Sequence, residues 1–168
     1  MSQWASAFAE SGLQVSKTVG DLAGPCFFSV LMGTARVVYA KVSDRVRLEA
    51  YIAGCAVLCI GSYILTVLPV HPVINLLGCG ICGFSVGVLW PGTFSMATRR
   101  CPNGGTAMFA LLALAGDLGC STGPTLVAMV SGLFQDLLKT GLAAAIVFPV
   151  LILICIALLE KLRKKKNI

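Results

Sequence analysis

Long apolar stretches recur along this chain, and they restrict its fold more than any other feature. A helix rises about 1.5 Å per residue, so about 20 apolar residues cross the hydrocarbon core of a bilayer, which is about 30 Å thick. The composition agrees, because 57% of the 168 residues are hydrophobic and only 12% are charged. We therefore expect an all-α integral membrane protein that is surrounded by the lipid bilayer.

Polar loops and turn residues divide the sequence into five predicted transmembrane helices, which form a single bundle within residues 1–168. These helices cover about residues 18–40, 50–68, 73–97, 106–133 and 141–159. Residues 1–15 have helical spacing but are too short to span, so we interpret them as the end of a truncated span. An amphipathic helix at the membrane interface is the alternative. Residues 160–168 form a basic tail.

Lys and Arg residues are distributed unevenly between the predicted spans. Ten of them follow the first, third and fifth spans, whereas only Lys17 and Lys139 lie on the opposite side. Short loops rich in Lys and Arg remain in the cytoplasm. We therefore expect a multi-pass protein of the plasma membrane with its C-terminus and basic tail in the cytoplasm. The basic residues are not gathered with aromatic residues into one surface, so nucleic-acid binding is not expected.

The sequence contains few signs of catalytic or metal chemistry. Seven of the eight cysteines lie within apolar stretches, and only Cys101 falls in a polar loop. Cys79 and Cys82 have the spacing of a redox or zinc pair, but no second pair follows, so we interpret the cysteines as small residues that pack between helices. A Walker-type loop and an HExxH motif are absent from the sequence. We expect neither an enzyme nor a cofactor or metal.

Three stretches of the chain resemble signatures of the major facilitator superfamily. Residues 40–45, Ala-Lys-Val-Ser-Asp-Arg, are similar to its GxxxD(R/K) loop, with Ala40 in place of the first glycine. Residues 119–124, Gly-Cys-Ser-Thr-Gly-Pro, resemble its GxxxGP helix motif. Residues 89–119 also look like its tenth helix, the short cytoplasmic loop that follows and the start of its eleventh helix.

This resemblance implies a specific fold and function. The chain would be the C-terminal half of such a transporter, from the end of helix seven through helix twelve, and would form one of two six-helix bundles that hold a solute between them at mid-membrane. It would move a small solute by alternating access, coupled to an ion gradient as a symporter or antiporter. Its partner would be a missing N-terminal six-helix bundle. The alternatives are a non-transporting fragment or assembly partner, and a small transporter that self-assembles.

Asp117 is an acidic residue within an apolar predicted span, where a charged side chain is not expected. It lies near the centre of the fourth predicted span, and no basic residue lies within ten positions of it. An unpaired carboxylate in lipid costs about 2.5–3.5 kcal/mol on insertion scales. Asp117 could stay protonated, pair with a cation from the absent bundle, or accept hydrogen bonds between helices that pack closely at Gly116 and Gly119. We predict that it couples transport to an ion, with helix packing as the structural alternative.

Three further residues are candidates for contact with the solute or ion. Trp90 lies inside the third predicted span, where a tryptophan packs between helices or lines a solute cavity. Gln3 and Trp4 belong to residues 1–15, which the resemblance places at the end of helix seven.

Charged residues near the first predicted span form a candidate cytoplasmic gate. In the family, the acid that corresponds to Asp44 pairs with a basic residue or a helix N-terminus, and Arg45 follows it. An ordinary solvated loop is the alternative. Arg36 lies one turn inside the span, where its long side chain either extends to the headgroups or pairs with Asp44.

Glycines in the third and fourth predicted spans allow helix backbones to approach closely. The residues of this predicted packing motif are Gly83, Gly87, Gly119, Gly123 and Pro124. Four prolines within spans, at positions 25, 91, 124 and 149, are expected to kink or loosen their helices.

Overall fold

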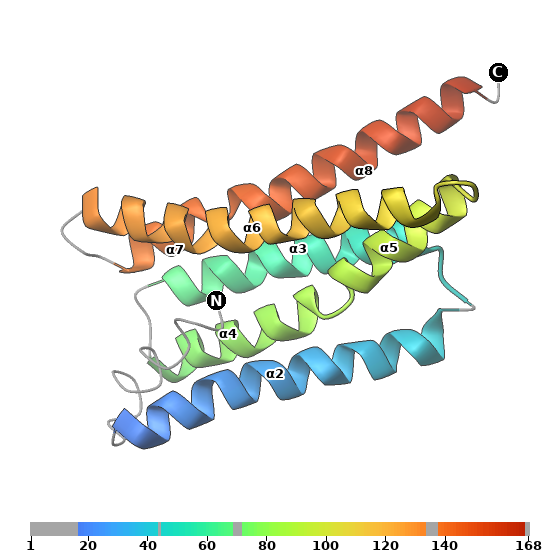
Figure 1. Cartoon of the computed structure of the whole chain (residues 1–168). Coiled ribbons are helices and arrows are strands. Elements are labelled where there is room, and N and C mark those ends of the chain that lie inside the picture. Colours follow the sequence, from blue (N-terminus) through green and yellow to red (C-terminus); the bar gives the residue numbers. More distant parts are fainter. Residues whose placement is uncertain (1–16, 44, 69–71, 134–137, 167–168) are drawn as a thin grey trace.

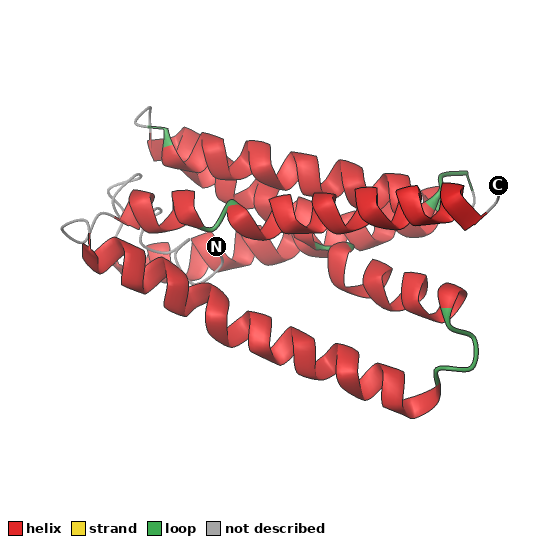
Figure 2. Cartoon of the chain, turned by 90° about the horizontal axis from the view of Figure 1, so that it is seen from above, coloured by secondary structure: helices red, strands yellow, loops and turns green. Residues whose placement is uncertain are grey.

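The computed structural model describes residues 17–43, 45–68, 72–133 and 138–166 (Figure 1). Its helices, in chain order, are α2 (Lys17–Val42), α3 (Leu48–Val67), α4 (Pro72–Val86), α5 (Leu89–Arg100), α6 (Gly105–Leu133), α7 (Leu138–Ala144) and α8 (Val147–Lys166). All regular secondary structure in these residues is helical (Figure 2). The short helix or truncated span that we predict for residues 1–15 lies outside the described part of the chain.

Five segments of the described chain are long and apolar enough to cross a membrane. They are Leu22–Val42, Leu48–Val67, Val73–Arg100, Gly105–Leu133 and Thr140–Leu162. Two of them join a pair of helices, since the third contains α4 and α5 and the fifth contains α7 and α8. The predicted all-α fold with five candidate membrane spans is therefore confirmed.

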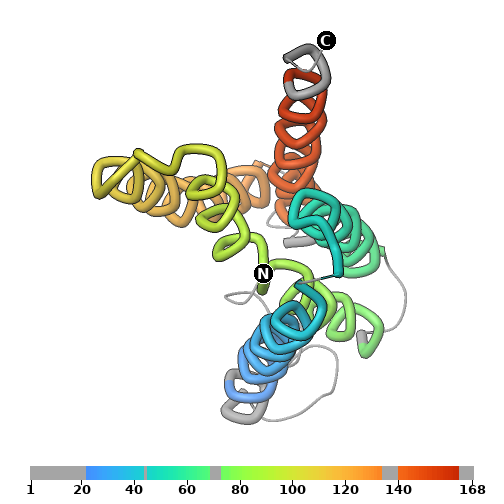
Figure 3. Tube along the Cα trace, turned by 90° about the vertical axis from the view of Figure 1, so that its right-hand side faces the viewer, coloured from blue at the N-terminus to red at the C-terminus, as the bar shows by residue number. Residues whose placement is uncertain are grey.

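Contacts between the helices are uneven. α4 packs against both α2 and α3, α3 also contacts α7 and α8, and α6 packs mainly against α7. Seen along the bundle, α2, α6 and α8 lie on three different sides (Figure 3). Within α6, which is described over its whole length, only Val127 is buried. The other residues of this helix keep much of their surface uncovered by the rest of the described chain.

Close packing between α2 and α4 depends on two of the predicted glycines. A Cβ atom added at Gly83 would overlap the backbone carbonyl of Phe28. One added at Gly87 would lie 2.6 Å from the carbonyl oxygen of Met32 and 2.9 Å from the Cβ atom of Ala35. Both distances are too short for a side chain, so glycine is what allows these backbones to touch.

The interface between α3 and α4 is lined by small and weakly polar side chains. Cys59 and Cys82 pack with Phe28 in one buried cluster. Ser62 and Ser85 are also buried, and each hydroxyl donates a hydrogen bond to the carbonyl three residues earlier, at 2.7 Å and 2.8 Å. These bonds satisfy the hydroxyls within their own helices, as an apolar environment requires.

The third candidate span is broken, because α4 ends at Val86 and α5 begins at Leu89. Pro91 explains where the break falls. A proline lacks the N–H that would bond to the carbonyl four residues earlier, and its ring collides with that carbonyl. That carbonyl belongs to Gly87, which lies within the break.

The break between α7 and α8 follows the same rule. Pro149 stands four residues after Ala145, and Ala145 and Ile146 separate the two helices. Here the amide of Phe148 donates to the carbonyl of Ala145 at 3.2 Å. The other two prolines, Pro25 and Pro124, lie inside the continuous helices α2 and α6.

Candidate functional site

One face of α6 carries polar side chains in the middle of a candidate membrane span. Asp117, Ser121 and Thr125 stand four residues apart and therefore lie on the same side of the helix, and all three are exposed. The Ser121 hydroxyl donates to the carbonyl of Asp117 at 2.9 Å, and the Thr125 hydroxyl donates to the carbonyl of Ser121 at 2.7 Å. The hydroxyls are thus satisfied by the backbone of α6.

The carboxyl group of Asp117 differs from these hydroxyls. Among the described residues, none forms a hydrogen bond or ion pair with it. A short acidic side chain cannot bond back to its own helix as a hydroxyl does, because an ionised carboxylate has no hydrogen to donate to a carbonyl. Facing lipid, it would be strongly unfavourable. This face of α6 therefore suits contact with water, a cation or a further protein surface rather than with lipid.

Aromatic rings connect α5 to the same region of α6. Trp90 stands edge-on to Phe94, with ring centroids 4.8 Å apart, and Phe94 stacks on Phe109 of α6 at 5.8 Å. The Trp90 ring also lies directly over Gly116, because a Cβ atom added there would overlap it. Trp90 remains 47% exposed. The fold thus places Trp90 beside the residue that precedes Asp117, so two predicted site residues come from adjoining positions.

A hollow of about 500 Å³ lies along α6, one to four turns beyond Asp117. Its described lining residues are Ser121, Thr122, Thr125, Leu126, Met129, Val130 and Leu133. The lining is largely apolar, with hydroxyl groups at the end nearest Asp117. All of these residues belong to α6, so within the described chain the hollow is an open surface along one helix.

Arg36 forms a contact that the sequence does not predict. Its Nε atom donates a hydrogen bond to the carbonyl oxygen of Gly87, at 3.1 Å, in the break between α4 and α5. The side chain therefore extends from α2 toward a neighbouring helix. The pairing with Asp44 that we considered involves a residue outside the described part of the chain.

The remaining gate residue lies in the loop after α2. Arg45 is exposed, and its backbone amide donates to the carbonyl of Val42 at 2.9 Å. Of the other candidates, Gln3 and Trp4 belong to residues that the structure does not describe, so their proposed contact with solute stays a prediction.

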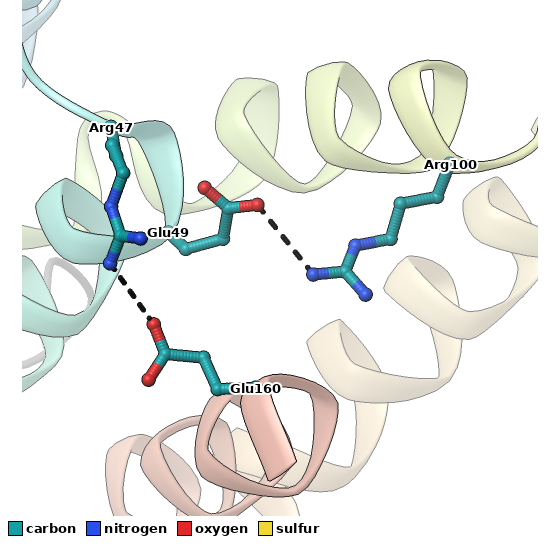
Figure 4. A network of polar contacts seen from close by, with 4 residues as sticks. All are labelled: Arg47, Glu49, Arg100 and Glu160. Carbon is teal, nitrogen blue, oxygen red and sulfur yellow. Dashed lines mark hydrogen bonds and ion pairs between the residues drawn. The ribbon is translucent and has the colours of Figure 1, made fainter. Parts of the chain in front are cut away.

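Two ion pairs form at the end of the bundle where α3 begins and α5 ends (Figure 4). Glu49 in the first turn of α3 pairs with Arg100 of α5 at 3.5 Å. Arg47, just before α3, pairs with Glu160 of α8 at 3.3 Å. Neither pair is predicted from the sequence. The one indication there is Arg47-Leu48-Glu49, which places charged residues at the start of an apolar stretch. Partly exposed pairs of this kind contribute about 0.2–1 kcal/mol each.

Two of the glycines predicted to pack on α6, Gly119 and Gly123, make no close contact in the described chain. No described atom lies within 4 Å of a Cβ atom added at Gly119 or Gly123, and Pro124 follows within the continuous helix. The close contact on α6 is made at Gly116, which is also one of the positions predicted to pack closely.

Residues 83–87, Gly-Phe-Ser-Val-Gly, have the GxSxG spacing of serine hydrolases. In those enzymes the serine stands exposed on a sharp turn between a strand and a helix. Here most of the motif lies within α4, Ser85 is fully buried, and its hydroxyl donates to the carbonyl of Cys82. This environment does not present Ser85 as a nucleophile.

Within the described residues, no group of three or more His, Cys, Asp or Glu side chains is placed to hold a metal ion. Comparison with known proteins gives no match, since no family model, no curated protein and no solved structure is significantly similar to this chain.

Proposed function

We propose that this chain is one half of a secondary active transporter of the major facilitator type. It corresponds to the end of helix seven and helices eight to twelve, and it moves a small solute by alternating access, coupled to an ion gradient. Its partner is a second six-helix bundle that faces α6. Solute lies between the two bundles, against Asp117 and Trp90.

The observation that carries this proposal is the Asp117 carboxyl on the uncovered face of α6. A carboxyl in the middle of a candidate membrane span, without a hydrogen bond or ion pair from the described residues, requires water, a cation or another protein surface. The hydroxyls of Ser121 and Thr125 extend the polar face, and the half-exposed ring of Trp90 adds an aromatic surface. Intramembrane acids in such positions serve as proton, ion or solute sites.

The proposed location is the plasma membrane, with the C-terminus in the cytoplasm. Basic residues support this orientation. The C-terminal ends of α2, α5 and α8 lie at the same end of the bundle (Figure 1), and Lys41, Arg100 and Lys161 belong to the C-terminal parts of these helices. Short loops with this bias remain on the cytoplasmic side.

A non-transporting assembly partner is the second candidate. The exposure of most of α6 favours it, since an uncovered helix explains association with another protein without any solute. The two candidates differ in their need for a carboxyl group at position 117. An assembly surface needs only shape and hydrogen bonding, whereas ion coupling needs a group that ionises.

Substitution of Asp117 tests the proposed function. We expect Asp117→Asn to preserve membrane insertion and assembly with the second bundle but to reduce gradient-driven solute uptake in proteoliposomes to the level of empty liposomes. The amide keeps the size and hydrogen bonding of the side chain but cannot carry a proton or balance a cation. Asp117→Glu keeps the carboxyl and serves as the matched control, with partial uptake retained.

Normal uptake by Asp117→Asn, with unchanged dependence on pH and on Na⁺, would show that the carboxyl is structural. Assembly without uptake in the unsubstituted protein, for every driving gradient, would favour the assembly partner.

A further inference from the structure

The break between α4 and α5 leaves the carbonyl oxygen of Gly87 without its usual donor. In a continuous helix the amide of residue 91 would bond to the carbonyl of Gly87, but residue 91 is proline. Arg36, from α2, donates its Nε–H to this oxygen at 3.1 Å. The guanidinium group therefore takes the place of the missing amide.

The packing around the break brings Arg36 into position. Gly87 lies against α2, where an added Cβ atom would be 2.9 Å from the Cβ atom of Ala35, the residue before Arg36. Ala35 itself is buried. Because the two backbones are this close, the Arg36 side chain can reach the carbonyl oxygen of Gly87 from α2. A carbonyl left unbonded within a membrane span is strongly unfavourable, so the bond matters to the stability of the break.

The direction of α5 depends on this break, and α5 carries Trp90 in its first turn. The Trp90 ring lies over Gly116, beside Asp117. We propose that Arg36 is a positioning residue: it replaces the amide that Pro91 lacks, fixes the angle between α4 and α5, and thereby sets Trp90 against α6. The consequence for solute binding rests on the proposed function, whereas the bond and its effect on Trp90 do not.

The hydrogen bond from Arg36 to Gly87 predicts an energetic coupling between substitutions at positions 36 and 91. Pro91→Ala returns an N–H to position 91, which can then bond to the carbonyl of Gly87 as in an ordinary helix. Loss of the arginine should therefore matter when residue 91 is proline and should matter little when it is alanine. A general role of Arg36 in packing or charge would give the same effect in both backgrounds.

The test is a double-mutant cycle in a Trp4→Phe background, which leaves Trp90 as the only tryptophan of the chain. Arg36→Met removes the donor while keeping an unbranched side chain, and it is combined with Pro91→Ala. Each purified variant is reconstituted into liposomes. The measurements are the Tm, the emission maximum of Trp90, and quenching of Trp90 by brominated phospholipid.

We expect Arg36→Met alone to lower the Tm by roughly 5 °C and to change both the emission and the quenching of Trp90. In the Pro91→Ala background, Arg36→Met should leave the Tm, the Trp90 emission maximum and the Trp90 quenching close to the values of the Pro91→Ala variant alone. Arg45→Met controls for loss of a cationic side chain at this end of α2, and Pro124→Ala controls for restoring an amide elsewhere. Arg45→Met should not couple to Pro91→Ala, and Pro124→Ala should not couple to Arg36→Met.

Equal effects of Arg36→Met in both backgrounds, or no effect in either, would overturn the proposal. If the Arg36→Met variant cannot be recovered from the membrane, the proposal requires that the double variant with Pro91→Ala can be recovered. Recovery of neither variant would also contradict the proposal. No solute is added in these measurements, so a failure of the proposed transport function leaves their result unaffected.

Discussion

Two glycines on α6 differ in what lies next to them. One is needed for a close contact with another side chain, whereas the other has open space beside it. Gly116 lies beneath the Trp90 ring. At Gly119, no described atom would lie within 4 Å of an added Cβ atom. Both are in the interior of the same helix, one turn apart. They therefore form a matched pair in which the same substitution has opposite expected effects.

We predict that Gly116→Ala lowers the free energy of unfolding by about 1–3 kcal/mol, because the methyl group overlaps the Trp90 ring, which must move away from its contacts with Gly116 and Phe94 to admit it. Gly119→Ala should be neutral or should stabilise the chain by about 0.5–1 kcal/mol, because alanine favours a helix more than glycine does. Thermal unfolding of the purified chain measures both. Equal destabilisation by the two variants would show that Trp90 does not rest on Gly116 in the membrane.

At the scale of the helix, the sequence predicts which segments are helical but not how each one is interrupted. All four prolines within spans are equally visible in the sequence, yet breaks precede only Pro91 and Pro149 in the described chain. Whether a freed carbonyl finds a donor depends on side chains from other helices. For Gly87 that donor is Arg36, 51 residues away in sequence, so local patterns do not reveal it.

The same limit applies to the candidate site. The chemistry of Asp117 can be predicted from the sequence, because an acid within a long apolar stretch is unfavourable whatever its neighbours are. Its proximity to Trp90 cannot, since it depends on the angle of α5 at the break. The ion pair of Arg47 with Glu160 spans 113 residues and likewise needs the packed bundle.

At the scale of the whole molecule, the loop between α5 and α6 reports the orientation in the membrane. Cys101 is exposed in this loop and follows Arg99 and Arg100. Cys26, Cys120 and Cys155 are also exposed, but they lie within candidate spans, where an aqueous reagent is excluded by lipid or by a partner. Cys101 is therefore the thiol that distinguishes the two sides of the membrane.

We predict that a membrane-impermeant thiol reagent labels Cys101 in inside-out vesicles and leaves it unlabelled in intact cells, because short loops rich in arginine remain on the cytoplasmic side. Cys101→Ser is the control and should abolish the labelling in vesicles. Strong labelling of Cys101 in intact cells would reverse the proposed orientation.

The central claim is that this bundle forms a transport pathway only together with a second one, because the polar face of α6 is uncovered in the described chain. Solute uptake into proteoliposomes under an imposed proton or sodium gradient, with the purified chain alone and with the second bundle supplied, tests this claim most directly. We predict no uptake above empty liposomes for the chain alone and saturable uptake for the two bundles together. Saturable, solute-specific uptake by the chain alone would contradict it and would indicate a transporter that assembles from copies of itself.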